Sequence, residues 1–186
     1  MSGTWKDGRA PVPSAPWADT LFGTTRFSWL WLVLRVYLGW QWFQAGFHKL
    51  GDPAWIQNGT ALKGFWTAAL VTTPKPRIAF DWYRSFLEFL LNGGHYAWFA
   101  KLVVAGELTV GTLLILGAFT GIAAFMGGFM NFNFMMAGTA STNPLLFTIS
   151  ILLILAWKAA GFYGLDRWLL PAVGTPWRGA SARTPG

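Results

Sequence analysis

Hydrophobic positions fall in four long runs separated by polar or glycine-rich stretches. The runs cover about residues 27–50, 96–116, 121–138 and 144–162. A helix needs roughly 20 apolar residues to cross the hydrocarbon core of a bilayer. The pattern therefore predicts an all-α integral membrane protein, a four-transmembrane-helix bundle over residues 27–163.

Residues 51–95 connect the first two runs and are predicted to be a helical, partly amphipathic linker. Two stripes appear at helical spacing within residues 77–91. Arg77, Asp81, Arg84 and Glu88 form one, and Ile78, Trp82, Phe86 and Phe89 form the other. We expect an interfacial helix here with its charges outward, as a solvated face.

Residues 1–26 and 164–186 are polar or rich in Pro and Gly, and both are predicted to be tails, the first of them mobile. Residues 1–26 show no secretory signal pattern. Four spans place both tails on one side of the membrane. Lys and Arg number seven on that side and six on the linker side, which does not decide the orientation. Cytoplasmic termini in the cytoplasmic membrane are our working assumption.

Composition narrows the chemistry further. The chain of 186 residues has 13 Trp, 16 Phe and no Cys. The lack of Cys excludes disulfide, Cys-ligated iron–sulfur and zinc–thiolate chemistry. Electron transfer would then require a diffusible cofactor or a partner's cofactor. The net charge of +7 favours anionic lipid or an anionic substrate, and no nucleic-acid motif is present.

Two charges lie deep in the predicted spans, Arg35 in the first and Glu107 in the second. Counted at about 1.5 Å per residue, both lie at similar depths from the terminal side, so we expect them to be partners. An ion pair that fixes helix register and a proton relay for a bound ligand both require such a pair.

A polar stripe of Gln41, Gln44 and His48 occupies the linker half of the first run. Its donors and acceptors suit the head group of a quinone, with Trp40 and Trp42 as an aromatic wall. Hydrogen bonding between helices is the alternative role for such residues. We predict no metal site and no haem.

Several short motifs resemble the DoxX/DoxD family. They are Arg35 in the first run, Gly46-Phe47-His48-Lys49-Leu50 at its end, and Glu107 followed by Leu116-Gly117-Ala118-Phe119-Thr120-Gly121. The linker from Thr73 through Asp81-Trp82-Tyr83 is similar to the longer DoxD-type members, and the resemblance covers roughly residues 27–165. It implies a four-helix membrane subunit of a thiosulfate:quinone oxidoreductase, which makes tetrathionate and quinol.

On this basis we expect a membrane subunit of a quinone-linked oxidoreductase. The expected catalytic residues are Arg35, Glu107, His48 and Lys49, and the expected substrate-binding residues are Lys49, Arg77, Arg84 and Lys101. The alternative is a non-catalytic membrane anchor or assembly subunit of a respiratory redox complex. Expected partners are the lipid bilayer and other redox subunits, with homo-oligomers as a further option.

Overall fold

The computed structural model describes residues 15–175 and 177, and these residues are helical without strands. The elements are α1 (Pro16–Phe22), η1 (Thr25–Phe27), α2 (Ser28–Leu50), α3 (Pro53–Ile56), α4 (Thr60–Leu70), α5 (Asp81–Asn92), α6 (Tyr96–Leu116), α7 (Thr120–Met136), α8 (Asn143–Leu155), α9 (Trp157–Gly161) and α10 (Asp166–Ala172). The all-α class is confirmed.

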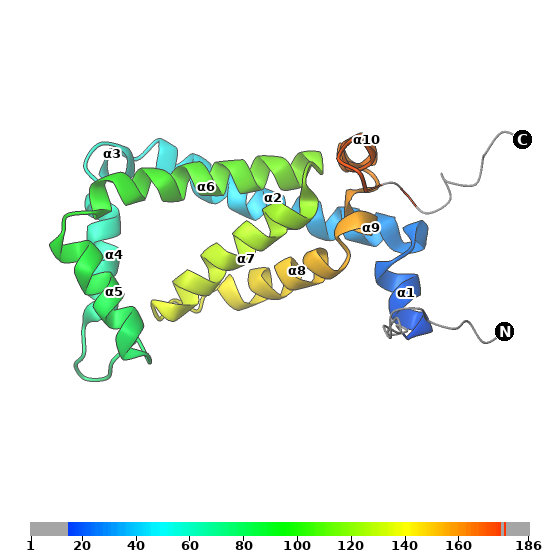
Figure 1. Ribbon diagram of the computed structural model, residues 1–186. Helices are drawn as coiled ribbons and strands as arrows, with labels where there is room; N and C mark the ends of the chain where they lie inside the picture. The colour runs from blue at the N-terminus through cyan, green and yellow to red at the C-terminus, as the bar shows by residue number, and fades with distance from the viewer. Residues whose placement is uncertain (1–14, 176, 178–186) are drawn as a thin grey trace, which may run out of the picture.

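Two helix pairs form the body of the molecule (Figure 1). Helix α2 packs along α6, and α7 packs along α8. Glycines permit the close approach of the backbones. A Cβ at Gly111 would lie 2.5 Å from the backbone nitrogen of Phe43, and one at Gly128 would lie 3.2 Å from Cβ of Ser150. Gly128 thus lies at the contact of α7 with α8, where a small residue lets two helices approach closely.

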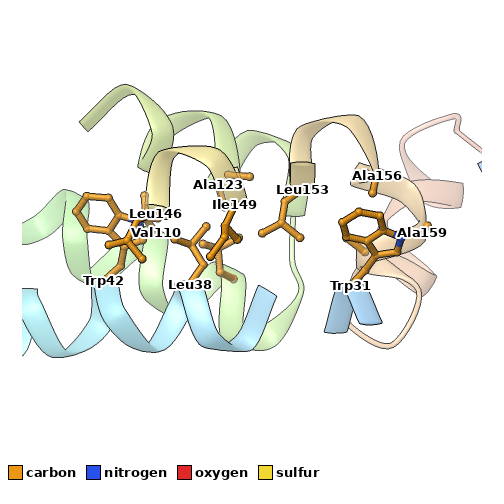
Figure 2. Close-up of a cluster of buried hydrophobic side chains, with 13 residues drawn as sticks. Trp31, Leu38, Trp42, Val110, Ala123, Leu146, Ile149, Leu153, Ala156 and Ala159 are labelled. Atoms are coloured by element: carbon orange, nitrogen blue, oxygen red, sulfur yellow. The ribbon is translucent and has the colours of Figure 1, made fainter. Parts of the chain in front are cut away.

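The main hydrophobic core lies between these pairs. Figure 2 shows Trp42 beside Leu146 and Val110, and Trp31 against the junction of α8 and α9. That junction corrects a prediction, because the fourth apolar run is not one helix. Helix α8 ends at Leu155 and a separate short helix begins at Trp157. Ala156 at the break is fully buried.

The linker forms a second unit with its own core, at the end of the bundle opposite α1 and α10 (Figure 1). Helix α5 turns Tyr83, Leu87 and Leu90 inward. The apolar stripe is not the face that packs on the linker core, because Trp82 and Phe89 are 62% and 65% exposed. The sequence pattern assigned the helix but not the side that packs.

Both predicted tails contain helices within the described residues. Residues 16–22 form α1, and the segment after 164 forms α10, whose first residue, Asp166, is fully buried. Helices α1 and α10 lie at the same end of the bundle (Figure 1). The remaining tail predictions, for residues 1–14, 176 and 178–186, lie outside the described residues.

Within the described residues, one helix combines the length and the hydropathy needed to cross a membrane, and this is α6. Helix α8 is apolar but has 13 residues, and α7 has 17. Helix α2 has 23 residues, but its polar residues lower its hydropathy. The four-span arrangement stays a prediction.

Candidate functional site

A cavity of about 320 Å³ opens between α2, α6, α7 and the loop that joins α7 to α8. Its lining residues are Gln41, Trp42, Ala45, Lys49, Trp55, Phe65, Glu107, Asn131, Phe134, Thr139, Ser141, Thr142, Asn143 and Leu146. Glu107 lies halfway along α6, so the cavity is at the middle of that helix rather than at its end.

An ion pair forms one side of the cavity. Nζ of Lys49 lies 2.7 Å from each carboxylate oxygen of Glu107. The Glu107 side chain is 1% exposed and that of Lys49 is 22% exposed. Nζ of Lys49 also lies 5.1 Å from the ring centroid of Trp55, which closes the cavity from α3. The pair presents one carboxylate and one ammonium group to a bound molecule.

Uncharged polar groups lie deeper in the same cavity. The side-chain amide of Asn131 is fully buried, and neither its nitrogen nor its oxygen has a hydrogen-bond partner among the described residues. The same holds for Nε1 of Trp42. The indole lies over Gly127, where a Cβ would meet Nε1 at 2.8 Å. Because Gly127 and Asn131 are four residues apart on α7, both groups share one helix face.

Aromatic rings form the walls. The ring of Phe134 lies 6.4 Å from that of Trp42 in a stacked arrangement, and 6.2 Å from that of Phe65 edge-on. The polar rim comes from the connecting loop, in which Ser141 has a positive φ of 43° and the amide of Asn143 donates to the carbonyl of Thr139. The site thus combines flat apolar walls with a few hydrogen-bonding groups.

The predicted quinone stripe does not face one place. Gln41 and Trp42 line the cavity, whereas Gln44 and His48 are exposed on the outer side of α2. Trp40 is 50% exposed and stacks on Phe43 outside the cavity. Gln44, His48 and Trp40 lie outside this cavity, on the exposed side of α2, and their role in quinone binding stays a prediction.

The predicted pairing of Arg35 with Glu107 is also wrong. Arg35 is 1% exposed at the other end of the bundle, where Nη2 donates to the carbonyl of Tyr163. The carboxylate that acts on its charge is Asp166. That carboxylate accepts the backbone N–H groups of Phe119 and Thr120, at 2.6 and 2.8 Å. Arg35 and Asp166 therefore hold the turn between α6 and α7.

The four cations predicted to bind substrate are dispersed. Arg84 donates to the carbonyls of Leu70 and Ile78 and holds the linker together. Arg77 and Lys101 are exposed. Lys49 alone of the four lines the cavity.

Several site residues were missed from the sequence. Asn131 was visible as a polar residue in an apolar run, which is the usual mark of a functional position in a membrane helix. Trp55 and Phe65 could not be recognised in this way, because the hydrophobic pattern of the linker does not show which of its residues pack on the bundle. Among the described residues, no three His, Asp or Glu side chains gather in a way that would hold a metal ion.

Comparison with protein-family models, with curated proteins and with solved structures finds no match to this chain.

Proposed function

We propose that the chain is a multi-pass protein of the cytoplasmic membrane in which α2, α6, α7 and the α8–α9 pair are the four spans. The exterior of the bundle supports this placement. Large apolar side chains are exposed along each span, among them Trp29, Val33, Leu102, Ile122, Phe125, Phe129, Leu145 and Ile151. Soluble monomers rarely expose an apolar surface that extends over several helices. Lipid chains would cover this surface without a desolvation cost.

The cavity, we infer, binds the head group of a quinone. The observation that carries this proposal is the pair of buried, unpartnered donors, Nε1 of Trp42 and Nδ2 of Asn131. A buried donor without a partner costs about 1–3 kcal/mol, so a ligand that accepts from it gains that energy. A quinone offers two carbonyl acceptors on a flat ring, which matches these donors and the aromatic walls. The volume of about 320 Å³ holds one such ring.

A bound quinone would accept two electrons and two protons and leave as a quinol. The chain's residues would orient it and supply the protons. Trp42 and Asn131 would fix one carbonyl by donating to it. Glu107, a carboxylate in its ion pair with Lys49, would take up a proton and pass it to the quinone, and Lys49 would compensate the charge of the carboxylate before and after this transfer. The partial exposure of Lys49 gives this end of the cavity contact with the exterior, from which Glu107 can be reprotonated.

At the level of the whole reaction, the chain would serve as a membrane subunit of a quinone-linked oxidoreductase. The resemblance to DoxD-type proteins names thiosulfate as the electron donor. Two thiosulfate dianions joined by a new sulfur–sulfur bond give tetrathionate and release two electrons. Because Arg84 is committed to the linker, an anion would be attracted by exposed Arg77 and Lys101 rather than by all four predicted cations.

A matched pair of glutamines on α2 tests the quinone site. Gln41 lines the cavity and Gln44, three residues later, faces outward. We expect Asn131→Leu and Gln41→Leu to weaken binding of a short-chain quinone to the purified protein about five- to tenfold or more, and Gln44→Leu to leave it unchanged. Titration calorimetry in detergent micelles measures the affinities.

Equal affinities in all three variants would overturn the quinone site. If the unmodified chain binds no quinone but purifies with other redox subunits, the anchor function replaces the proposed one. Thiosulfate as donor is tested separately, by following quinone reduction on addition of thiosulfate to membranes that contain the chain.

A further inference from the structure

The outer face of α2 carries a continuous exposed stripe. Trp29, Val33, Val36, Tyr37, Trp40 and Phe47 are exposed, at spacings of one, three, four and seven residues. Gln44 and His48 lie on the same stripe and are exposed as well. Neither side chain has a hydrogen bond to another residue in the part of the chain that the structure describes. The stripe contains no Asp, Glu, Lys or Arg.

Contacts with α6 fix the depth of the two polar residues. Gly46 of α2 packs against Leu108, and Lys49 pairs with Glu107 at the middle of α6. His48 is therefore level with the middle of α6, and Gln44 lies about 6 Å from that level, at 1.5 Å per residue. If α6 crosses the membrane, both side chains are inside a hydrocarbon core of about 30 Å.

Lipid acyl chains offer no hydrogen-bond partners to the amide of Gln44 and the imidazole of His48. An amide or an imidazole that faces acyl chains loses the hydrogen bonds that it makes in water, and this loss costs several kcal/mol on hydrocarbon scales. Side chains of a helix also lean toward its N-terminus, so Gln44 leans away from the nearer end of α2. Polar residues at such positions face protein in membrane bundles.

We propose that this face of α2 is the interface between two copies of the chain. Two copies with the same membrane orientation are related by an axis along the membrane normal, so their α2 helices run parallel and equal residues meet. An amide donates and accepts, so Gln44 of one copy pairs with Gln44 of the other. Neutral His48 is self-complementary in the same way. Trp40 and Phe47, one turn to either side of Gln44, exclude lipid from the pair.

The interface and the cavity lie on different sides of α2. Gln41, Ala45 and Lys49 face the cavity, whereas Gln44 and His48 face outward. A second copy would leave the cavity open, so dimerisation does not depend on the proposed quinone site. It does depend on the proposed membrane placement.

Cysteine cross-linking tests the interface directly, because the chain has no native Cys. Trp40→Cys and Phe47→Cys are made singly with Gln44 intact, and Phe125→Cys on α7, which is 59% exposed, is the matched control. Oxidation in native membranes should convert the first two variants into a covalent dimer of twice 20.6 kDa and leave the control monomeric. Adding Gln44→Leu should weaken dimerisation roughly three- to tenfold, and Gln44→Asn should retain most of it.

Several results would overturn the dimer. These are no cross-link at either α2 position, equal cross-linking at Phe125→Cys, or a product whose mass matches a different protein. Extraction of the chain from membranes by alkaline carbonate would instead contradict the proposal that it spans the membrane. Quinone affinity of Gln44→Leu is measured in parallel, so loss of the dimer with unchanged affinity separates this interface from the proposed quinone site.

Discussion

Lys49 and Glu107 form a two-pronged ion pair, with Nζ 2.7 Å from both carboxylate oxygens, although 58 residues separate them in the sequence. The pair joins the end of α2 to the middle of α6 and forms one side of the cavity. Its two members are not equally placed, because Glu107 is almost fully buried and Lys49 is partly exposed. Their removal should therefore have unequal effects.

Removing Lys49 should destabilise the fold more than removing Glu107. Lys49→Met leaves a buried carboxylate without its counter-charge, and we expect a loss of about 3–5 kcal/mol in the free energy of unfolding. Glu107→Gln leaves a lysine that remains partly exposed, so the loss should be smaller. The double variant Lys49→Met/Glu107→Leu should recover much of the first loss. Denaturant unfolding in detergent micelles gives all three values, and strictly additive losses would show that the pair is not coupled.

Asp166 should be needed to form the turn between α6 and α7. It accepts two backbone N–H groups at the start of α7 from a segment 46 residues away. Asp166→Ala leaves both N–H groups without their acceptor and removes the charge that faces Arg35, so we expect a loss of about 2–4 kcal/mol. Asp166→Asn should cost less because it keeps one acceptor. Asp81→Asn, at an exposed carboxylate on α5, is the control and should change little; similar losses in both would contradict the role of Asp166.

Cysteines introduced singly near the two ends of the described chain should lie on the same side of the membrane. Thr25 and Val173 are exposed at the terminal end of the bundle, and Lys75 is exposed in the linker. A membrane-impermeant maleimide applied to intact cells should label Thr25→Cys and Val173→Cys alike and Lys75→Cys oppositely. Labelling only of Lys75→Cys would place the termini in the cytoplasm. Opposite results for Thr25→Cys and Val173→Cys would contradict four spans.

The sequence was sufficient for the positions of the long helices. Apolar runs bounded by Gly or Pro matched α2 and α6 within one residue, since Gly51 and Gly117 end them as expected. Depth along a helix, by contrast, did not reveal which residues meet. Gly39 packs against Leu114 and Ile115, so α2 begins about nine residues, roughly 14 Å, beyond the end of α6. This stagger moves Arg35 to Gly117 and brings Lys49 to Glu107.

Residues of the site could be predicted only where a single residue was recognisable without knowing how the helices pack. Glu107 was assigned from its charge inside an apolar run and Lys49 from the family resemblance, and both line the cavity. The direction of Gln44 depends on which face of α2 packs, and periodicity alone left two candidate faces. The role of Asp166 could not be predicted, because its partners are backbone N–H groups, which do not appear in a pattern of side chains. The segment that contains it has the composition of a loop.

The stability of the linker unit should fall at high pH because of Tyr83. Burial raises the pKa of Tyr83 to about 12, and its hydroxyl donates to the carbonyl of Asn133 on α7 at 2.9 Å. The folded state thus favours the neutral phenol over the phenolate. The contribution of Tyr83 to the free energy of unfolding is complete below the unfolded pKa of about 10. It declines as the pH rises from 10 to 12, by about 1.4 kcal/mol per pH unit.

Tyr83→Phe should cost about 1 kcal/mol at pH 8, from the lost hydrogen bond, and should reduce the decline above pH 10. Tyr163→Phe, at a ring that is 53% exposed, should keep the full decline. Denaturant unfolding of the three proteins from pH 8 to pH 11.5 measures the difference, and parallel curves for Tyr83→Phe and the unmodified chain would show that Tyr83 does not link α5 to α7 in this way.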